Sequence, residues 1–137
     1  MNEQASPGHD ARAELRIGLV GCGEVCEHKH LPGLRRVTGA RVVAVADRDR
    51  ARGDRVAGRY AIPRVFTSAR ELLESGEVDA VGVLVPPGEH SEVTLAALAA
   101  GTHVLVEKPV TLDLAEADAL VAAARAATGR SLMGFHM

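Results

Sequence analysis

The sequence predicts an α/β fold built on a doubly wound parallel sheet, and two observations lead to this prediction. Apolar runs of strand length alternate with helical segments along the chain, as right-handed crossovers between parallel strands require. Aromatic residues make up only 2% of the chain although 47% of it is hydrophobic. The core therefore has to consist of Val, Leu, Ile and Ala, which suits strands that are buried on both faces. We expect the strand order 3-2-1-4-5-6.

The expected strands are apolar runs that stop at residues unsuited to a strand. The first run stops at Gly21, the second at Asp47, and the fourth at Pro86 and Pro87. The expected strands are 15–20, 41–46, 65–66, 79–85, 103–106 and 131–135.

Helices are expected between the strands, and capping residues mark two of their starts. Ser68 with Glu71, and Asp113 with Glu116, have the spacing of a capping box, in which each side chain bonds to the other's backbone N–H. The last helix should bury one apolar stripe. The expected helices are 24–37, which Pro32 and Gly33 kink or shorten, 48–60, a segment after Ser68, 88–100, and 113–128, whose apolar stripe consists of Leu114, Ala117, Leu120, Val121 and Ala124.

Composition and charge narrow the class of protein. Residues 1–13 are polar and lack the apolar core of a signal peptide, so we expect a disordered leader followed by one folded domain over 14–137. No apolar run is long enough for a transmembrane helix, and no basic block suggests nucleic-acid binding. The two cysteines, Cys22 and Cys26, do not suggest a disulfide framework, and a reducing cytoplasm fits better.

The strongest local signal is the glycine turn Gly21-Cys22-Gly23 after the first expected strand. The first glycine permits a sharp turn, and the second lets a diphosphate approach the backbone at a helix N-terminus. Cys26 stands where a third glycine usually helps the helix to pack. Since glycines also mark ordinary turns, a purely structural turn is the alternative interpretation.

Asp47 ends the second expected strand, where a carboxylate can accept hydrogen bonds from the adenosine ribose hydroxyls. The alternative is an Asp that only caps a helix. A carboxylate would repel a 2′-phosphate, which favours NAD as the cofactor. Arg48 and Arg50 could pair with such a phosphate, so NADP stays open.

Two further clusters follow the fourth and fifth expected strands: Pro86-Pro87 with His90, and Glu107-Lys108-Pro109. Ligands of an open parallel sheet bind beyond the carboxyl ends of its strands, so both clusters belong on the same rim as the glycine turn. Taken singly, the prolines could simply end a strand and the lysine could be solvated.

Together with the closing Gly134-Phe135-His136, these motifs closely resemble the glucose-fructose oxidoreductase/inositol dehydrogenase (Gfo/Idh/MocA) family over residues 14 to 137. The resemblance implies a Rossmann domain of an NAD(P)-dependent oxidoreductase that moves a hydride between nicotinamide and a sugar, cyclitol or related alcohol. It makes Lys108 the catalytic residue and places Glu107 near the nicotinamide ribose. The implied cofactor-binding residues are Gly21, Gly23, Glu24, Val25, Asp47, Arg48, Pro86, Pro87, His90, Glu107 and Lys108.

The family's second domain, which supplies most substrate contacts, is absent here. We therefore expect a truncated or separated domain that is inactive alone. The rival interpretation is a non-catalytic NAD(P)-binding regulatory or interaction module. Apolar surface near the sixth strand should be bare, which favours association into a homo-oligomer.

The histidines and cysteines do not suggest a metal site. His28 and His30 are two residues apart and so face different sides of a helix, and no spacing brings three ligands together. His30 matches a histidine common in the first helix of the family. The spacing of Cys22 and Cys26 does not match a thioredoxin-type motif, and small residues tolerated in the turn explain them better.

Overall fold

The computed structural model describes residues 13–130 and 132–134. Of the expected leader only Ala13 belongs to the described residues. Ser131 and Phe135 of the sixth expected strand, and the closing His136, also lie outside them.

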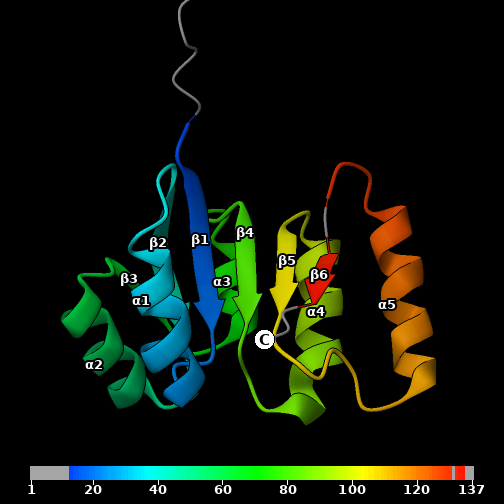
Figure 1. Cartoon of the computed structure of the whole chain (residues 1–137), viewed down its shortest axis with the longest axis horizontal. Helices are drawn as coiled ribbons and strands as arrows, with labels where there is room; N and C mark the ends of the chain where they lie inside the picture. Colours follow the sequence, from blue (N-terminus) through cyan, green and yellow to red (C-terminus); the bar gives the residue numbers. More distant parts are fainter. Residues whose placement is uncertain (1–12, 131, 135–137) are drawn as a thin grey trace, which may run out of the picture.

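A six-stranded parallel sheet forms the centre of the molecule, in the order β3-β2-β1-β4-β5-β6 (Figure 1). This confirms the expected strand order, and the first and fifth strands have the expected bounds. The fourth strand is shorter than expected and ends before Leu84. The strands are β1 (Leu15–Val20), β2 (Ala40–Ala46), β3 (Arg64–Phe66), β4 (Ala80–Val83), β5 (His103–Val106) and β6 (Leu132–Gly134).

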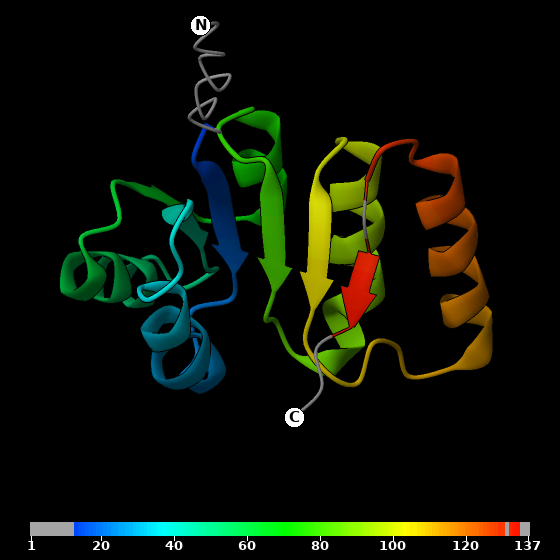
Figure 2. The same ribbon diagram turned by 45° about the horizontal axis from the view of Figure 1, so that its top comes forward.

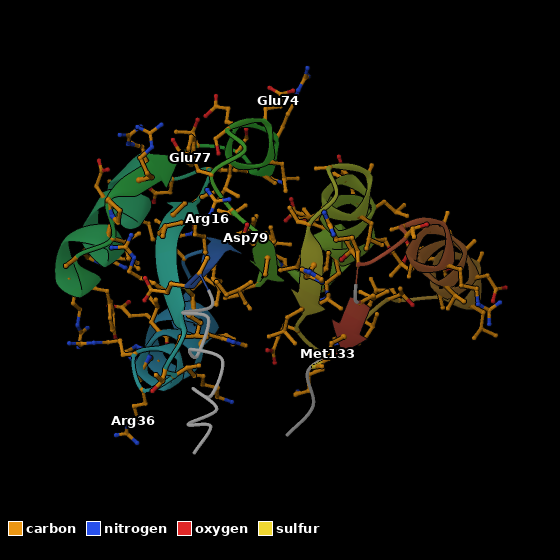
Figure 3. The ribbon with its side chains drawn as sticks, turned by 90° about the horizontal axis from the view of Figure 1, so that it is seen from above. Arg16, Arg36, Glu74, Glu77, Asp79 and Met133 are labelled. Carbon is orange, nitrogen blue, oxygen red and sulfur yellow. The ribbon has the colours of Figure 1, made fainter. Side chains whose placement is uncertain are left out.

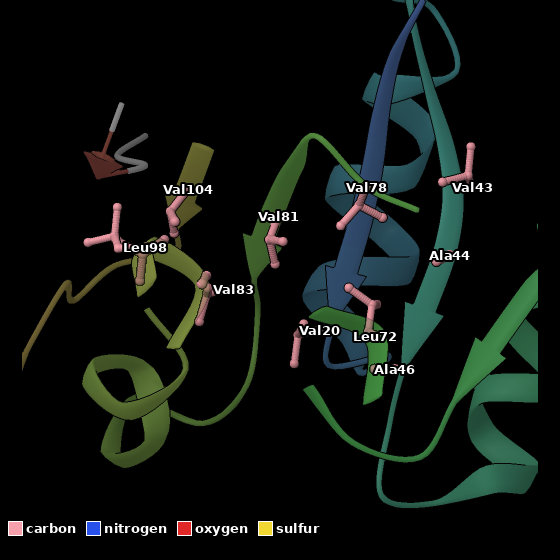
Figure 4. Close-up of a cluster of buried hydrophobic side chains, with 12 residues drawn as sticks. Val20, Val43, Ala44, Ala46, Leu72, Val78, Val81, Val83, Leu98 and Val104 are labelled. Carbon is pink, nitrogen blue, oxygen red and sulfur yellow. The ribbon is translucent and has the colours of Figure 1, made fainter. Parts of the chain in front are cut away.

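Helices cover both faces of this sheet and enclose two separate cores (Figure 2). The larger core packs β1, β2, β4 and β5 against α3 (Ala69–Glu74), α4 (His90–Ala99) and α5 (Leu114–Ala126), and Leu72 of α3 and Leu98 of α4 are among its buried side chains (Figure 4). The smaller core lies beneath α1 (Leu31–Leu34) and α2 (Arg50–Tyr60). Two cores on one sheet are what a doubly wound fold requires.

The first expected helix is divided into two parts. Its middle is a π-helical turn, η1 (Cys26–His30), in which the N–H of Leu31 donates to the carbonyl of Cys26, and α1 follows directly. Pro32 has no N–H to donate, and in a regular helix its ring would collide with the carbonyl four residues back. The wider turn relieves this conflict, so the proline changes the helix locally rather than ending it.

The remaining helices start close to where their caps were expected, with differences in detail. The second helix begins at Arg50 rather than at Arg48, and Asp49 caps it, because its carboxylate accepts the N–H of Arg52. Ser68 caps α3 by accepting the N–H of Glu71, but the carboxylate of Glu71 bonds to Thr67 instead of returning to Ser68. Of the two bonds in the capping box predicted for Ser68 and Glu71, the one from the Glu71 N–H to Ser68 is confirmed, and the returning bond to the Ser68 N–H was wrong. The fourth helix begins as a 3₁₀ turn, η2 (Pro87–Glu89), before α4.

The apolar stripe expected on the last helix was wrong in part. Leu120 is buried, but Leu114 and Val121 are 83% and 46% exposed. Ala123 and Ala124 of α5, and Ala127 directly after it, pack against the larger core. Because this helix carries alanine on several sides, residue type does not decide which face turns inward.

An ion pair joins β1 and β4 near their amino ends, where Arg16 and Asp79 meet (Figure 3). Two nitrogens of the guanidinium and the backbone N–H of Arg16 all donate to the Asp79 carboxylate, at 2.9 to 3.2 Å. These bonds, the side-chain ones first, hold the pKa of Asp79 below its usual value. The pair holds β1 and β4 together at their amino-terminal ends, on the opposite side of the sheet from the strands' carboxyl ends.

Candidate functional site

A cavity of about 800 Å³ lies at the carboxyl ends of β1, β2, β4 and β5. A cavity of this size is large enough for a cofactor. All the residues predicted as contacts lie on its wall, although they come from distant parts of the chain: Gly21, Gly23, Glu24, Val25, Asp47, Arg48, Pro86, Pro87, His90, Glu107 and Lys108.

The two glycines of the turn differ in what the fold demands of them. Gly21 has a φ of +100°, and a Cβ there would lie 2.7 Å from the backbone of Leu84. The fold itself therefore requires glycine at this position. At Gly23, by contrast, a Cβ would meet nothing within 4 Å, because this glycine faces the cavity. Within the described part of the chain, the space above Gly23 is open.

Helical bonding begins directly after this turn, with the N–H of Glu27 donating to the carbonyl of Gly23 at 3.0 Å. Backbone N–H groups in the first turn of a helix have no acceptor within the helix, and they carry the positive end of its dipole. Gly23, Glu24 and Val25 all lie on the cavity wall. The turn thus presents donors and an open surface together, which suits a phosphate group.

Asp47 is held against the glycine turn by its own carboxylate. One oxygen accepts the N–H of Cys22 at 2.9 Å, and the other accepts the N–H of Asp49 at 2.8 Å. The Asp47 side chain is 8% exposed, and Arg52 lies 3.5 Å from it. Since each carboxylate oxygen can accept two hydrogen bonds, the group keeps acceptor capacity toward the cavity. The sequence did not reveal that this acid also orders the turn.

The arginines near Asp47 are already paired. Arg48, 82% exposed, forms an ion pair with Glu89 of η2, which joins the segment after β2 to the segment after β4. Arg50 donates to Asp54 at 3.1 Å along its own helix. Glu89 lines the cavity but was not among the predicted site residues. No local spacing relates it to Arg48, so only the folded chain reveals this contact.

The segment Glu107-Lys108-Pro109 follows β5 at the same rim. Lys108 is exposed and lines the cavity, and its peptide bond to Pro109 is cis. The Glu107 carboxylate contacts Nε2 of His30 at 2.7 Å, and both side chains are nearly buried. This pair joins residues 77 positions apart, so sequence spacing could not predict it.

His90 supports the cavity wall rather than offering its ring nitrogens to a ligand. It is 1% exposed, with Nδ1 at 2.7 Å from the carbonyl oxygen of Pro109 and Nε2 at 2.7 Å from that of Val85. Both nitrogens are engaged by the backbone. The expectation that His90 lines the groove thus becomes more specific, because the ring can touch a ligand only through its carbon edge.

Cys22 and Cys26 are both fully buried beneath the glycine turn. A hydrogen bond with Cys22 and, to a smaller extent, burial raise the pKa of Cys26 far above its usual value. A thiol of this kind is a packing residue rather than a nucleophile. Among the described residues, no three His, Cys, Asp or Glu side chains gather as metal ligands, and no helix there has the length and apolarity to cross a membrane.

Comparison with known proteins places these features among oxidoreductases. Residues 15–135 match the family model described as "Oxidoreductase family, NAD-binding Rossmann fold". The chain is 42% identical over 114 residues to a dTDP-3,4-didehydro-2,6-dideoxy-alpha-D-glucose 3-reductase of Saccharopolyspora spinosa, with 83% of this chain and 34% of the relative covered. It is 38% identical over 120 residues to inositol 2-dehydrogenase 4 of Saccharopolyspora erythraea, with 88% and 35% covered.

A solved structure gives the same result. A 3-ketoreductase from Actinomadura kijaniata, in complex with TDP-benzene and NADP, superposes with a TM-score of 0.82 at 38% identity, covering 88% of this chain and 37% of that one. The chain thus spans about a third of the length of the relatives that it matches.

Proposed function

The chain belongs to the Gfo/Idh/MocA oxidoreductase family as its NAD(P)-binding Rossmann domain, and from this premise we propose which residues hold the cofactor and what they do. The diphosphate lies over Gly23 and the N–H groups of Glu24 and Val25. The adenosine ribose lies against Asp47, and the nicotinamide end reaches the segment around Lys108. Within a whole protein of this family, the domain serves hydride transfer between nicotinamide and a sugar, cyclitol or related alcohol.

The open space above Gly23 carries this proposal. Gly23 lies at the helix N-cap on the cavity wall, and among the described residues no atom outside its own turn of chain comes within 4 Å of its Cβ position, so packing within the protein does not explain the glycine. A diphosphate that approaches the backbone does explain it. Gly21, whose glycine the fold needs, carries no such information.

We propose NAD rather than NADP as the preferred cofactor. The Asp47 carboxylate is fixed by two backbone N–H groups and would repel a 2′-phosphate. Of the arginines near this carboxylate, Arg48 and Arg50 are paired with Glu89 and Asp54, and Arg52 is paired with Asp47 itself. A related 3-ketoreductase binds NADP, so the preference has to be measured for this chain.

Lys108 is the residue through which this domain contributes to the reaction. When bound, nicotinamide accepts or donates the hydride. The Lys108 ammonium, on the cavity wall beyond β5, donates a hydrogen bond to the reacting oxygen and polarises it, or takes part in moving its proton. Glu107 lies beside the nicotinamide ribose. The residues Pro86 and Pro87 shape the opposite wall.

Three further properties belong to this proposal. The folded unit is 14–137, preceded by a leader over 1–13. The protein is cytoplasmic, as its two free buried thiols suggest. It self-associates through apolar surface near β6, where the side chain of Met133 is 63% exposed.

Calorimetric titration of the chain with NADH and with NADPH tests the cofactor proposal. We expect saturable binding with NADH the tighter ligand. Asp47→Asn keeps the size of the side chain but removes its charge, so it should weaken NADH and narrow or reverse the preference. No saturable binding of either cofactor at millimolar concentration would refute the proposal, and a preference for NADPH would refute the role given to Asp47.

A further inference from the structure

Two buried histidines from different elements contact the two sequence neighbours of Lys108. His30, at the end of η1, contacts the side chain of Glu107, and His90, at the start of α4, contacts the backbone of Pro109. Lys108 itself is exposed on the cavity wall. The arrangement leaves the lysine accessible while the residues on either side of it are fixed.

The contact between His30 and Glu107 is a short, nearly buried one and not a solvent-exposed ion pair. Their side chains are 6% and 12% exposed, and Nε2 lies 2.7 Å from the carboxylate oxygen. A short contact to a carboxylate that is largely removed from water is among the stronger hydrogen bonds in proteins. The carboxylate of Glu107 is thereby tied to η1, the segment that follows the glycine turn.

His90 connects the two other segments at the rim. Its Nδ1 lies 2.7 Å from the carbonyl of Pro109 and its Nε2 lies 2.7 Å from the carbonyl of Val85. Each carbonyl accepts a hydrogen bond from the ring nitrogen that faces it when that nitrogen carries a proton. The ring is 1% exposed, so water does not compete for these two carbonyl groups. The backbone after Lys108 is thus joined to the end of β4.

We propose that His30 and His90 are positioning residues that hold Lys108 at the nicotinamide end of the cavity. This inference rests on the proposed function, in which Lys108 acts there. Neither histidine is a catalytic residue, because the ring nitrogens of His90 are engaged by the backbone and His30 acts through Glu107. Loss of either contact frees one neighbour of Lys108 without touching the glycine turn or Asp47.

Nuclear magnetic relaxation of the Lys108 backbone amide tests the proposal without any cofactor. An Asn side chain can replace the Nδ1 donor of histidine, and a Gln side chain can replace the Nε2 donor. His90→Asn therefore keeps the bond to Pro109 and should leave Lys108 ordered, whereas His90→Gln keeps only the bond to Val85 and should make Lys108 mobile. Likewise, His30→Ala should mobilise Lys108 and His30→Gln should restore its order. His28→Ala, on the same helix with a 56% exposed side chain, is the matched control.

Titration with two ligands separates positioning from general damage. ADP-ribose occupies the glycine turn and Asp47 but lacks nicotinamide. In His30→Ala and His90→Gln we expect the Kd for NADH to rise about tenfold and that for ADP-ribose to change less than about twofold. A loss of fold would weaken both ligands equally.

The outcomes distinguish this inference from the proposed function. If the unaltered chain binds neither ligand, the proposed function fails, while the relaxation data still report on Lys108. If the chain binds NADH but the histidine variants leave Lys108 as ordered as in His28→Ala, or leave NADH affinity unchanged, the inference is overturned. Should His90→Gln not fold, the His30→Ala and His30→Gln pair decides the matter.

Discussion

Replacing each glycine of the turn by alanine should separate the needs of the fold from those of the cofactor. In Gly21→Ala the new methyl would lie 2.7 Å from the carbonyl carbon and oxygen of Leu84 and 2.9 Å from the nitrogen of Val85, at a φ of +100°. A left-handed backbone destabilises a non-glycine residue by about 1–2 kcal/mol, and overpacking adds about 1–3 kcal/mol. The crowding is against backbone atoms, which cannot rotate away, so we expect the variant to lose about 2–5 kcal/mol of unfolding free energy.

In Gly23→Ala the methyl meets no protein atom within 4 Å. Because glycine is favoured over alanine at a helix N-cap, we expect a loss of about 0.5–1 kcal/mol of unfolding free energy, smaller than that of Gly21→Ala. The same methyl occupies the space proposed for the diphosphate, so the Kd for NADH should rise at least about tenfold.

Urea unfolding followed by far-ultraviolet circular dichroism gives the first quantity, and NADH titration gives the second. Each variant serves as the control for the other. The reasoning is refuted if Gly23→Ala binds NADH normally, or if Gly21→Ala is as stable as the unaltered chain.

Three further predictions concern the ion pair at the amino-terminal ends of β1 and β4, the last helix and the thiols. Because Arg16 lowers the pKa of Asp79, this pair stabilises the fold at pH values above the ordinary carboxyl pKa, and the contribution is lost as the pH falls through the lowered value. Asp79→Asn should therefore be less stable in urea at pH 7, and its difference from the unaltered chain should shrink toward strongly acid pH. A stability difference that does not depend on pH would contradict this cause. Leu120→Ala should lose about 2–5 kcal/mol of unfolding free energy, because Leu120 is buried. Leu114→Ala, on the exposed face of the same helix, should change the unfolding free energy by less than about 0.5 kcal/mol. Equal losses in the two variants would show that the buried face is misassigned. Cys22 and Cys26 should react with a thiol reagent only as fast as the chain opens, so that the rate rises with urea, and rapid labelling of the native chain would show that they are accessible.

The sheet could be predicted from sequence because its strands are buried on both faces. Buried residues such as Val81 and Val104 lie in segments that are apolar throughout, so each strand was recognisable as an apolar segment bounded by polar, Gly or Pro residues. The strand order then followed from the rules of parallel crossovers. That the glycine turn and Asp47 lie at the same end of the sheet could be predicted for a similar reason, since each directly follows a strand.

The parts that sequence did not reveal are contacts between distant residues and choices among equivalent ones. Nothing in the spacing relates His30 to Glu107 or Arg48 to Glu89, because those pairs form only after the strands have been placed. The buried face of α5 was misjudged because alanines lie around much of that helix, so packing against the sheet selects the face.

In the proposed site, Asp47 both orders the glycine turn and selects the cofactor with one carboxylate, which would limit how the protein can change its choice of cofactor. A substitution that removes this carboxylate to admit a phosphorylated ribose also removes at least one of the two oxygens that accept the Cys22 and Asp49 amides, so the altered chain must recover that order elsewhere. Selection, natural or in the laboratory, is therefore expected to change this position together with its neighbours, and a lone exchange that shifts the preference should also weaken the protein.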